Sequence, residues 1–274
     1  MDMLTLSPRQ AFEDNMRPAE LLLRVYRLLE CETLQTDGDM VRGLRLAMHD
    51  VARDLGRDEE VILIYNEIFI GLVRERAQIP PSALKRSALK NLLRQSIVAA
   101  CTGLDSYLPA LLRTNLPTVI RSRGRDFFPQ DADLKEFFSE LTFDLAETLR
   151  LLSDPEAPFY IANKILGLTK FKYLSSKKGI FAVGALLSIE KPWDQIAAKL
   201  QRDRKELMKI IDETTTRRND IVHRADRPQT DPGGEIQDVS YSWSQQSVDT
   251  IKHVCLALDE LVVERMAQLQ AGEL

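Results

Sequence analysis

Three side chains within six consecutive residues, Arg218, Asn219 and His223, could together promote proton transfer at a phosphate group. A histidine has an unperturbed pKa near neutrality, so it can accept and donate protons there. The arginine guanidinium presents a planar fork of donors that matches phosphate oxygens and the charge developing on them. An asparagine amide can hold the imidazole or a phosphate oxygen by hydrogen bonding. These residue types suit cleavage of an RNA chain by its own 2′-hydroxyl group.

The spacing of these residues predicts how a helix would present them. Residues four apart share a helical face, so Asn219 and His223 are expected to stack on one row. Arg218 is expected on the inward row, where it must be paired or must line a polar cleft. That inward row also contains Ile211, Thr214 or Thr215, Ile221 and Val222. Asp220 and Arg224 are four apart as well and are expected to pair on the outer face.

The number of histidines limits what one chain can do. The sequence holds three, and His49 and His253 fall in other predicted helices, so only His223 belongs to the motif. Attack by the 2′-hydroxyl group and departure of the leaving group are each accelerated by a side chain that accepts or donates a proton. A two-fold dimer would bring two copies of the motif together and supply the second histidine. We therefore expect a homodimer with a shared cleft.

Other sequence features limit the kinds of catalytic site that the motif could form. The arginine-to-histidine spacing alone is a weak signal, because Arg42 and His49 show a similar spacing without a polar partner in register. The sequence contains no C-x2-C pair, no H-E-x-x-H motif and no glycine-rich phosphate loop. We therefore expect neither a metal nor another cofactor at the motif.

Composition is that of an ordinary globular protein. The 274 residues are 44% hydrophobic and 28% charged, and the formal net charge of −4 argues against a protein that grips nucleic acid with its whole surface. No apolar stretch approaches the ~20 residues that span a bilayer, and no secretory signal opens the sequence. The cysteines at 31, 101 and 255 are far apart and are expected to be buried thiols of a reducing, cytoplasmic environment.

Helical periodicity dominates the sequence, and strand alternation is almost absent, which predicts an all-α protein. A connection is expected over residues 116–133 and a helix over 134–152. The expected core face of that helix consists of Phe137, Phe138, Leu141, Leu145, Leu149 and Leu152. A single helix is expected from Pro192 through the motif to about Ala225. The predicted helices cover residues 8–29, 39–51, 59–78, 82–112, 134–152, 192–225 and 244–268.

Several residues outside the motif have two readings. Tyr241 and Trp243 could stack on an RNA base, but more often such residues pack a loop onto its domain. Asp105 is more often a helix residue with a local hydrogen bond than a catalytic acid. Two basic groups, the lysines at 170, 172, 177 and 178 and the arginines at 121, 123 and 125, could follow RNA phosphates or form a solvated face.

The wider context of the motif resembles a known family. The run from Arg217 to Asp226 resembles the signature of HEPN domains, in particular the RiboL-PSP-HEPN branch. The segment from Gly103 to Leu108 looks like the first conserved helix of that branch, and so does the order of a Trp193 helix before the motif and one helix after it. Pro109 stands where related sequences often carry a histidine. The resemblance covers roughly residues 85–265.

The resemblance implies an HEPN-like helical bundle over residues 81–274, with residues 1–80 as an N-terminal helical extension. It implies a dimeric, metal-independent endoribonuclease in which Arg218 and His223 are catalytic and Asn219 supports them. Arg217 and Arg224 are the expected RNA-binding residues. The family suggests a role in toxin–antitoxin systems or antiviral defence, with an antitoxin or regulatory protein as a further partner. The alternative is a noncatalytic HEPN-like module that binds RNA or another protein.

Overall fold

The computed structural model describes residues 7–32, 86–127, 135, 138–168, 174–231 and 233–271. Within these ranges the chain forms eight α-helices, one short 3-10 helix and no strand, which confirms the all-α prediction. The predicted boundary at residues 80–81 and the helices predicted at 39–51 and 59–78 lie outside the described residues. None of the described helices is both long and apolar enough to cross a membrane.

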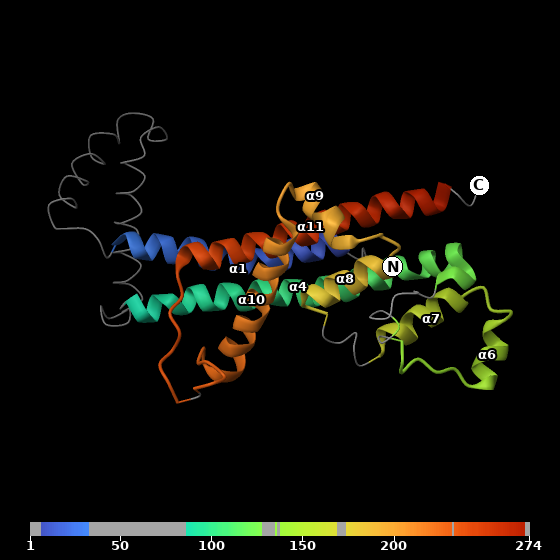
Figure 1. Ribbon diagram of the computed structural model, residues 1–274, viewed down its shortest axis with the longest axis horizontal. Helices are drawn as coiled ribbons and strands as arrows, with labels where there is room; N and C mark the ends of the chain where they lie inside the picture. The colour runs from blue at the N-terminus through green and yellow to red at the C-terminus, as the bar shows by residue number, and fades with distance from the viewer. Residues whose placement is uncertain are drawn as a thin grey trace, which may run out of the picture.

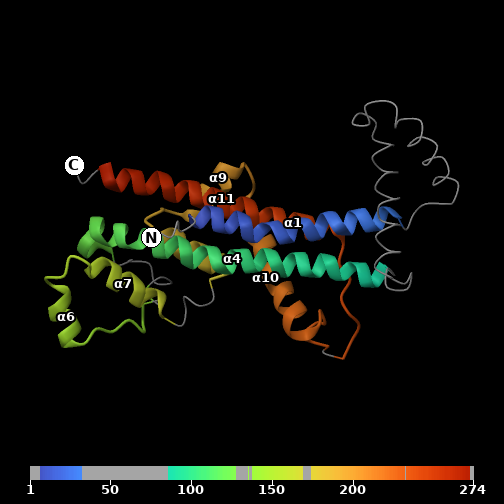
Figure 2. The ribbon, with the colours of Figure 1, turned by 180° about the vertical axis from the view of Figure 1, so that it is seen from behind.

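Three long helices form the body of the protein. They are α1 (Pro8–Glu32), α4 (Arg86–Arg123) and α11 (Tyr241–Ala271), which lie side by side in both views (Figures 1 and 2). Their facing sides bury apolar residues at helical spacing, and the rings of Phe12 and Tyr107 lie 4.9 Å apart. Lys252 of α11 donates to Glu20 of α1 across a 2.5 Å ion pair. The N-terminal helix therefore shares one core with the helices that carry the motif region.

The predicted connection at residues 116–133 is wrong in its first part, because α4 continues to Arg123 before the 3-10 helix η2 (Gly124–Phe127). Pro109 and Pro117 both lie inside α4. A proline inside a helix costs about 3 kcal/mol because it removes a hydrogen bond and crowds the preceding turn. Leu116 and Val119, next to Pro117, are fully buried. We infer that burial of such apolar side chains outweighs the cost, as tertiary packing commonly does.

The helix predicted at residues 134–152 is wrong in extent, and its predicted core face is right only in part, because Phe138 and Leu141 pack against the core whereas its three later leucines do not. The structure has α6 (Leu145–Leu151) and α7 (Ala157–Leu166), and Leu145, Leu149 and Leu152 are 75%, 58% and 78% exposed. A capping box starts α6, in which the Asp144 carboxylate accepts from the Glu147 backbone N–H at 2.7 Å. The same Glu147 holds α7 through Lys164 and Tyr160, and these hydrogen bonds lower the pKa of Glu147 to about 2.

The motif helix is shorter than predicted. The expected single helix over 192–225 is two helices, α9 (Pro192–Leu200) and α10 (Arg204–Arg224), which follow α8 (Lys177–Leu186). Gln201 ends α9 in the left-handed region, and the Arg202 N–H reaches back to the Ala197 carbonyl, as in a Schellman motif. Asp203 then caps α10 by accepting from the Glu206 N–H at 2.8 Å. The cap at the end of α9 and the cap at the start of α10 thus divide a stretch whose apolar periodicity predicts one continuous helix.

A buried carboxyl group lies in the core between α4 and α11. Asp259 accepts a hydrogen bond from the Tyr107 hydroxyl at 3.2 Å, and that hydroxyl also contacts the Cys255 carbonyl at 3.1 Å. Burial raises the pKa of Asp259, while Tyr107 and Arg9 oppose the rise. The Arg9 guanidinium is 3.9 Å from the other carboxylate oxygen. The carboxyl group therefore binds its proton more tightly in the folded protein than in the unfolded chain.

The raised pKa of Asp259 predicts a specific pH dependence of stability. The folded state binds the proton more tightly than the unfolded chain, whose aspartate pKa is about 3.9. This contribution is full below that value and is lost as pH rises through the folded pKa. Asp259→Asn is therefore expected to raise the free energy of unfolding at pH 7 relative to the original protein. Urea denaturation at pH 7 and pH 4 should show a smaller gain at pH 4, and an equal or larger gain there would contradict this account.

Candidate functional site

Arg218 points from α10 toward α4, as its predicted inward row requires. One guanidinium nitrogen, Nη2, donates to the Asp105 carboxylate at 2.7 Å and to the Ser175 hydroxyl at 3.2 Å. Burial raises the pKa of the neighbouring Cys101 thiol to about 12, against an opposing effect of Arg218. The side chain of Arg218 is 21% exposed, so it is not fully enclosed. Arg218 is thus paired and partly accessible.

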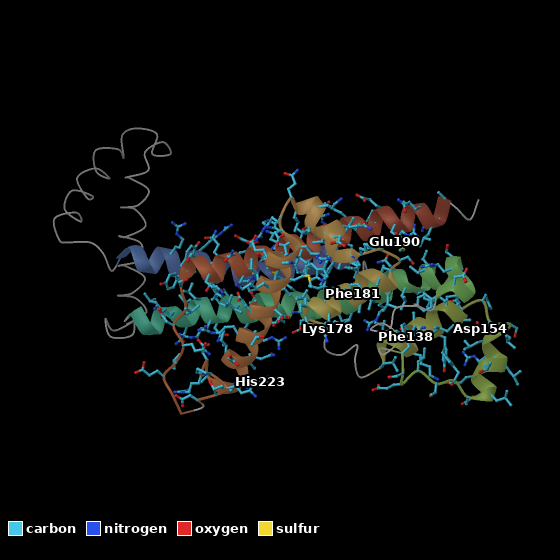
Figure 3. All side chains as sticks on the ribbon, in the orientation of Figure 1. Phe138, Asp154, Lys178, Phe181, Glu190 and His223 are labelled. Atoms are coloured by element: carbon cyan, nitrogen blue, oxygen red, sulfur yellow. The ribbon has the colours of Figure 1, made fainter. Side chains whose placement is uncertain are left out.

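Asn219 and His223 both face solvent on the other side of α10. Neither side chain makes a hydrogen bond or an ion pair to any part of the chain that the structure describes, and both are exposed. His223 lies near the end of α10 that extends beyond the three long helices (Figure 3). The imidazole and the amide are therefore available to a substrate or to another protein chain. This agrees with their predicted common row.

Arg218 and His223 do not share a face within one chain. Five residues on an α-helix correspond to a rotation of about 140° around its axis. The Arg218 guanidinium is tied to α4, whereas His223 is exposed. A substrate group that contacts both side chains of one copy would have to bridge this separation, which is a reason to consider two copies of the motif together.

Two details of the predicted faces are corrected. Val222, expected to face inward, is 51% exposed, because the last turns of α10 extend past the packed helices. Asp220, expected on the outer face, is buried and pairs with Arg224. The Gln237 amide approaches the same carboxylate at 3.5 Å. The residues that follow α10 fold back over this side of the helix, so the outer face here is covered.

Arg217 belongs to an internal ion-pair network. It donates to the Asp226 carboxylate at 2.9 Å and to the Asp238 backbone carbonyl at 2.9 Å. From α4, Arg94 donates to the same carboxylate at 2.5 Å, and Asp226 is only 1% exposed. Asp226 and the preceding Ala225 adopt left-handed backbone conformations, with φ of +63° and +49°. The network therefore fixes the sharp reversal of the chain directly after the motif.

The two arginines predicted to bind RNA are thus engaged within the protein. Arg217 is committed to Asp226 and backbone carbonyls, and Arg224 to Asp220. Both keep part of their guanidinium surface exposed, at 16% and 30% of the side chain. Any contact with RNA phosphates would therefore be made by cations whose charge is already partly balanced.

A cavity of about 490 Å³ lies beside α10 on the side of Arg217. Its lining comprises Asp212, Glu213, Thr216, Arg217, Asp220, Gln237 and Trp243. The Arg217 guanidinium lies 5.7 Å from the centre of the Trp243 ring. Tyr241, by contrast, stacks on Tyr26 of α1 with ring centres 6.0 Å apart, so it packs the start of α11 onto the core. Of the two aromatic candidates, Trp243 lines this cavity and Tyr241 does not.

Of the other candidates, Lys170 and Lys172 lie outside the described residues, and those within them make no side-chain contact with Asn219 or His223. His253 is exposed on α11, and His49 lies outside the described residues, as does Cys31. Cys101 and Cys255 are buried with free thiols, as expected. Arg123 contacts the Ser188 hydroxyl at 3.3 Å, and Arg121 lies over the Phe159 ring. Within the described ranges, no three His, Cys, Asp or Glu side chains are grouped as a metal site would require.

Sequence reasoning missed the partners that hold the motif in place. The sequence presents Asp105 as a helix residue with a local hydrogen bond or as a catalytic acid, yet it pairs with Arg218, 113 positions away. Arg94 interrupts the apolar line of α4 between Leu93 and Ile97 and is 8% exposed. A charged residue within such an apolar line was the available signal, because a buried arginine needs a buried acidic partner.

The Arg218–Asp105 pair gives a limited stability prediction. Asp105→Asn removes the negative charge and keeps a side chain of the same shape. Because the two side chains are 21% and 40% exposed, solvent screens the pair, and the loss in unfolding free energy should be no more than about 1 kcal/mol. Urea denaturation measures this change. A loss of several kcal/mol would show that Asp105 supports the core rather than only the position of Arg218.

Comparisons with known proteins give no further assignment. The similarity to the HEPN branch therefore rests on residues of this sequence alone. The chain matches no protein-family model, no curated protein and no solved structure.

Proposed function

We propose that this protein is a metal-independent endoribonuclease of the HEPN type, with Arg218, Asn219 and His223 as its catalytic residues. The observation that supports this proposal is the state of the motif: Asn219 and His223 are exposed and have no partner in the described part of the chain, next to an arginine that is held in place. Exposed, unpartnered groups on one row are available to a substrate. The proposal extends to a homodimer because one chain supplies one histidine to the motif.

The reaction follows from the chemistry of these groups. His223 accepts the proton of an RNA 2′-hydroxyl, whose oxygen attacks the adjacent phosphorus. The bond from phosphorus to the 5′-oxygen breaks, and His223 of the partner subunit gives that oxygen a proton. The products are a 2′,3′-cyclic phosphate and a 5′-hydroxyl. Arg218 stabilises the charge that develops on the phosphate oxygens, and Asn219 orients the phosphate or the imidazole.

Arg218 retains donors for this task while it is bound to Asp105. A guanidinium carries five N–H donors. The contacts to Asp105 and Ser175 both use Nη2, and the Cys101 thiol is a further neighbour of the guanidinium. The ion pair therefore fixes the orientation of the guanidinium without consuming it. Such fixed donors favour transition-state stabilisation because they need no rearrangement during the reaction.

Exposed apolar side chains near the motif support a dimer at this surface. Val222 in the motif helix and Ile236 in the segment after it are each 51% exposed. Ile236 precedes Gln237, whose N–H donates to the Asp226 carbonyl at 2.9 Å, so this segment lies beside the end of α10. Burial of these side chains by a second copy would remove apolar surface from water at the place where two motifs must meet.

The resemblance to the HEPN branch suggests the biological setting. A ribonuclease of this kind would act in a toxin–antitoxin system or in antiviral defence, where RNA cleavage arrests growth. An antitoxin or regulatory protein would then restrain it, and the exposed surface around His223 is a natural place for such control.

The proposal is tested by incubating the purified protein with a defined single-stranded RNA in excess EDTA. We expect internal cleavage, and mass spectrometry of the fragments should show 2′,3′-cyclic phosphate and 5′-hydroxyl ends. Light scattering at micromolar concentration should give twice the mass of one chain. Cleavage that requires added Mg²⁺, 5′-phosphate ends, or an active monomer would each contradict the mechanism.

The Arg218–Asp105 ion pair favours the alternative of a noncatalytic module, because it also explains Arg218 as a bridge between α10 and α4. In that case the helices would serve as a scaffold that binds RNA or a protein partner. The Arg218→Ala/His223→Ala variant would then retain the biological effect of the protein on its host cell. Growth arrest that either single substitution abolishes would rule this alternative out.

A further inference from the structure

A second pocket lies between α8, α9 and the beginning of α10. Its volume is about 410 Å³, which is within the range of small-molecule sites. Apolar side chains from three helices line it: Phe181 of α8, Trp193 of α9 and Met208 of α10. The indole N–H of Trp193 donates to the Lys177 backbone carbonyl at 3.0 Å, which fixes the ring in the wall. A preformed apolar wall with two aromatic rings suits a flat, unsaturated ring system.

The same pocket is surrounded by positive charge. Four cationic side chains line it, Lys177, Lys178, Lys191 and Arg204, against the single carboxylate of Asp194. This surplus is local, because the chain as a whole carries a formal net charge of −4. A binding partner of this pocket is therefore expected to be anionic.

The four cationic side chains differ in whether they already form an ion pair within the protein. Lys177 pairs with Asp212 at 2.6 Å, and Arg204 pairs with Asp194 at 2.9 Å. Lys178 and Lys191 are exposed, and their side chains make no hydrogen bond or ion pair with the described residues. The acidic side chain in the lining is thus neutralised by Arg204, and two lysines keep their full charge for an anion.

We propose that this pocket binds a phosphorylated nucleoside, with its base against Phe181, Trp193 and Met208 and its phosphate near Lys178 and Lys191. Aromatic walls with interleaved cations are the features that bind bases and phosphates together, since stacking and phosphate contacts reinforce each other. The nucleoside phosphate is either one unit of a single-stranded RNA or a free mononucleotide. Both present the same chemistry to the pocket.

This pocket is separate from the motif. Met208 precedes His223 by fifteen residues on α10 (208 to 223), which corresponds to about 22 Å along the helix axis. In Figure 3, Lys178 and Phe181 lie on α8, whereas His223 lies toward the opposite end of α10. The proposed binding is measured without cleavage and therefore does not depend on the proposed ribonuclease activity.

The two tryptophans of the chain allow a direct test with 5′-AMP. In a Trp243→Phe protein, Trp193 is the only remaining tryptophan. Titration with 5′-AMP should change its fluorescence with saturation, while adenosine and inorganic phosphate should bind at least about tenfold more weakly, because each offers only half of the contacts. Equal binding of phosphate and 5′-AMP would overturn the role of the apolar wall.

Matched lysine variants test the role of charge. Lys178→Ala/Lys191→Asn removes both unpaired cations, and asparagine tolerates the left-handed φ of +46° at position 191, so the fold should persist. Lys205→Ala, at an exposed lysine of α10 outside the pocket lining, is the control. The double variant should bind 5′-AMP about tenfold more weakly, in proportion to two lost charge contacts. An equal effect of Lys205→Ala would overturn the proposal.

A second measurement distinguishes RNA from a free nucleotide. Anisotropy of a labelled single-stranded decamer RNA, with His223→Ala proteins in EDTA, gives affinity as a function of salt. If the pocket holds a unit of RNA, the double lysine substitution should reduce the slope of log K against log salt by about 1.4, which is about 0.7 per lost contact. An unchanged slope together with weakened 5′-AMP binding identifies a free mononucleotide. If both measurements remain unchanged, the pocket does not bind nucleoside phosphates.

Discussion

His223→Ala is expected to lower the rate of RNA cleavage by a factor of about 10² to 10⁴, the usual contribution of a side chain that transfers a proton in the transition state. Because His223 is exposed and makes no contact with the described residues, its removal should leave the fold intact. In a homodimer the substitution removes both the acid and the base, so the effect should lie toward the upper end. Single-turnover cleavage of a labelled RNA measures it.

The chain offers a matched control for this experiment. His253 is another exposed histidine, on α11, and His253→Ala should cleave RNA at the original rate. Arg218→Lys is informative beside it, because it keeps the charge but loses the planar fork that fits a phosphate and the fixed pair with Asp105. Equal rates for the original protein and His223→Ala would disprove the catalytic role of the motif.

Asp226→Ala should have the largest effect on stability of any substitution near the motif. Asp226 is 1% exposed and pairs with both Arg94 and Arg217, so its removal leaves two largely buried guanidinium groups with backbone carbonyls as their main remaining acceptors. Loss of one partner from a buried ion pair costs about 3–5 kcal/mol. Urea denaturation should therefore show a decrease of this size in the free energy of unfolding.

Asp238→Ala is the control for Asp226. This carboxylate lies in the same segment and pairs with Lys90, but it is 79% exposed, so its loss should lower the free energy of unfolding far less than the loss of Asp226 does. A similar, small effect of both substitutions would show that the Asp226 network does not determine stability. Loss of RNA cleavage in Asp226→Ala, in parallel with unfolding, is expected as well, because the network fixes the end of the motif helix.

The parts of the fold that the sequence predicts well are those determined by long apolar stripes. The inward line of α11, with Val248, Ile251, Cys255 and Leu258, is buried as predicted. Periodicity is less informative where other forces compete. The leucines at 145, 149 and 152 show helical spacing, yet the helix that carries the first two is only seven residues long and has no buried residues, and Leu152 lies just beyond its end. A stripe predicts a helical face but does not identify what covers it.

Prediction of the candidate site is limited for a related reason. The motif residues and the inward direction of Arg218 follow from helix geometry, because they depend on residues within a few turns. The pairs Arg218–Asp105 and Arg94–Asp226 join residues more than 100 positions apart, so nothing in the local sequence specifies them. The internal commitment of Arg217 and Arg224 depends in part on the path of the chain after Ala225, which turns sharply back.

The order of the three long helices along the chain has a consequence for biosynthesis. Glu20 of α1 pairs with Lys252 of α11, and 232 residues separate them. At about 5–20 residues per second, the ribosome needs roughly 12 to 46 seconds to add that stretch. Until α11 has been synthesised, it cannot cover the apolar sides of α1 and α4 that pack against it in the folded protein. The newly made chain therefore exposes apolar surface before its core can close, which is the condition that favours aggregation.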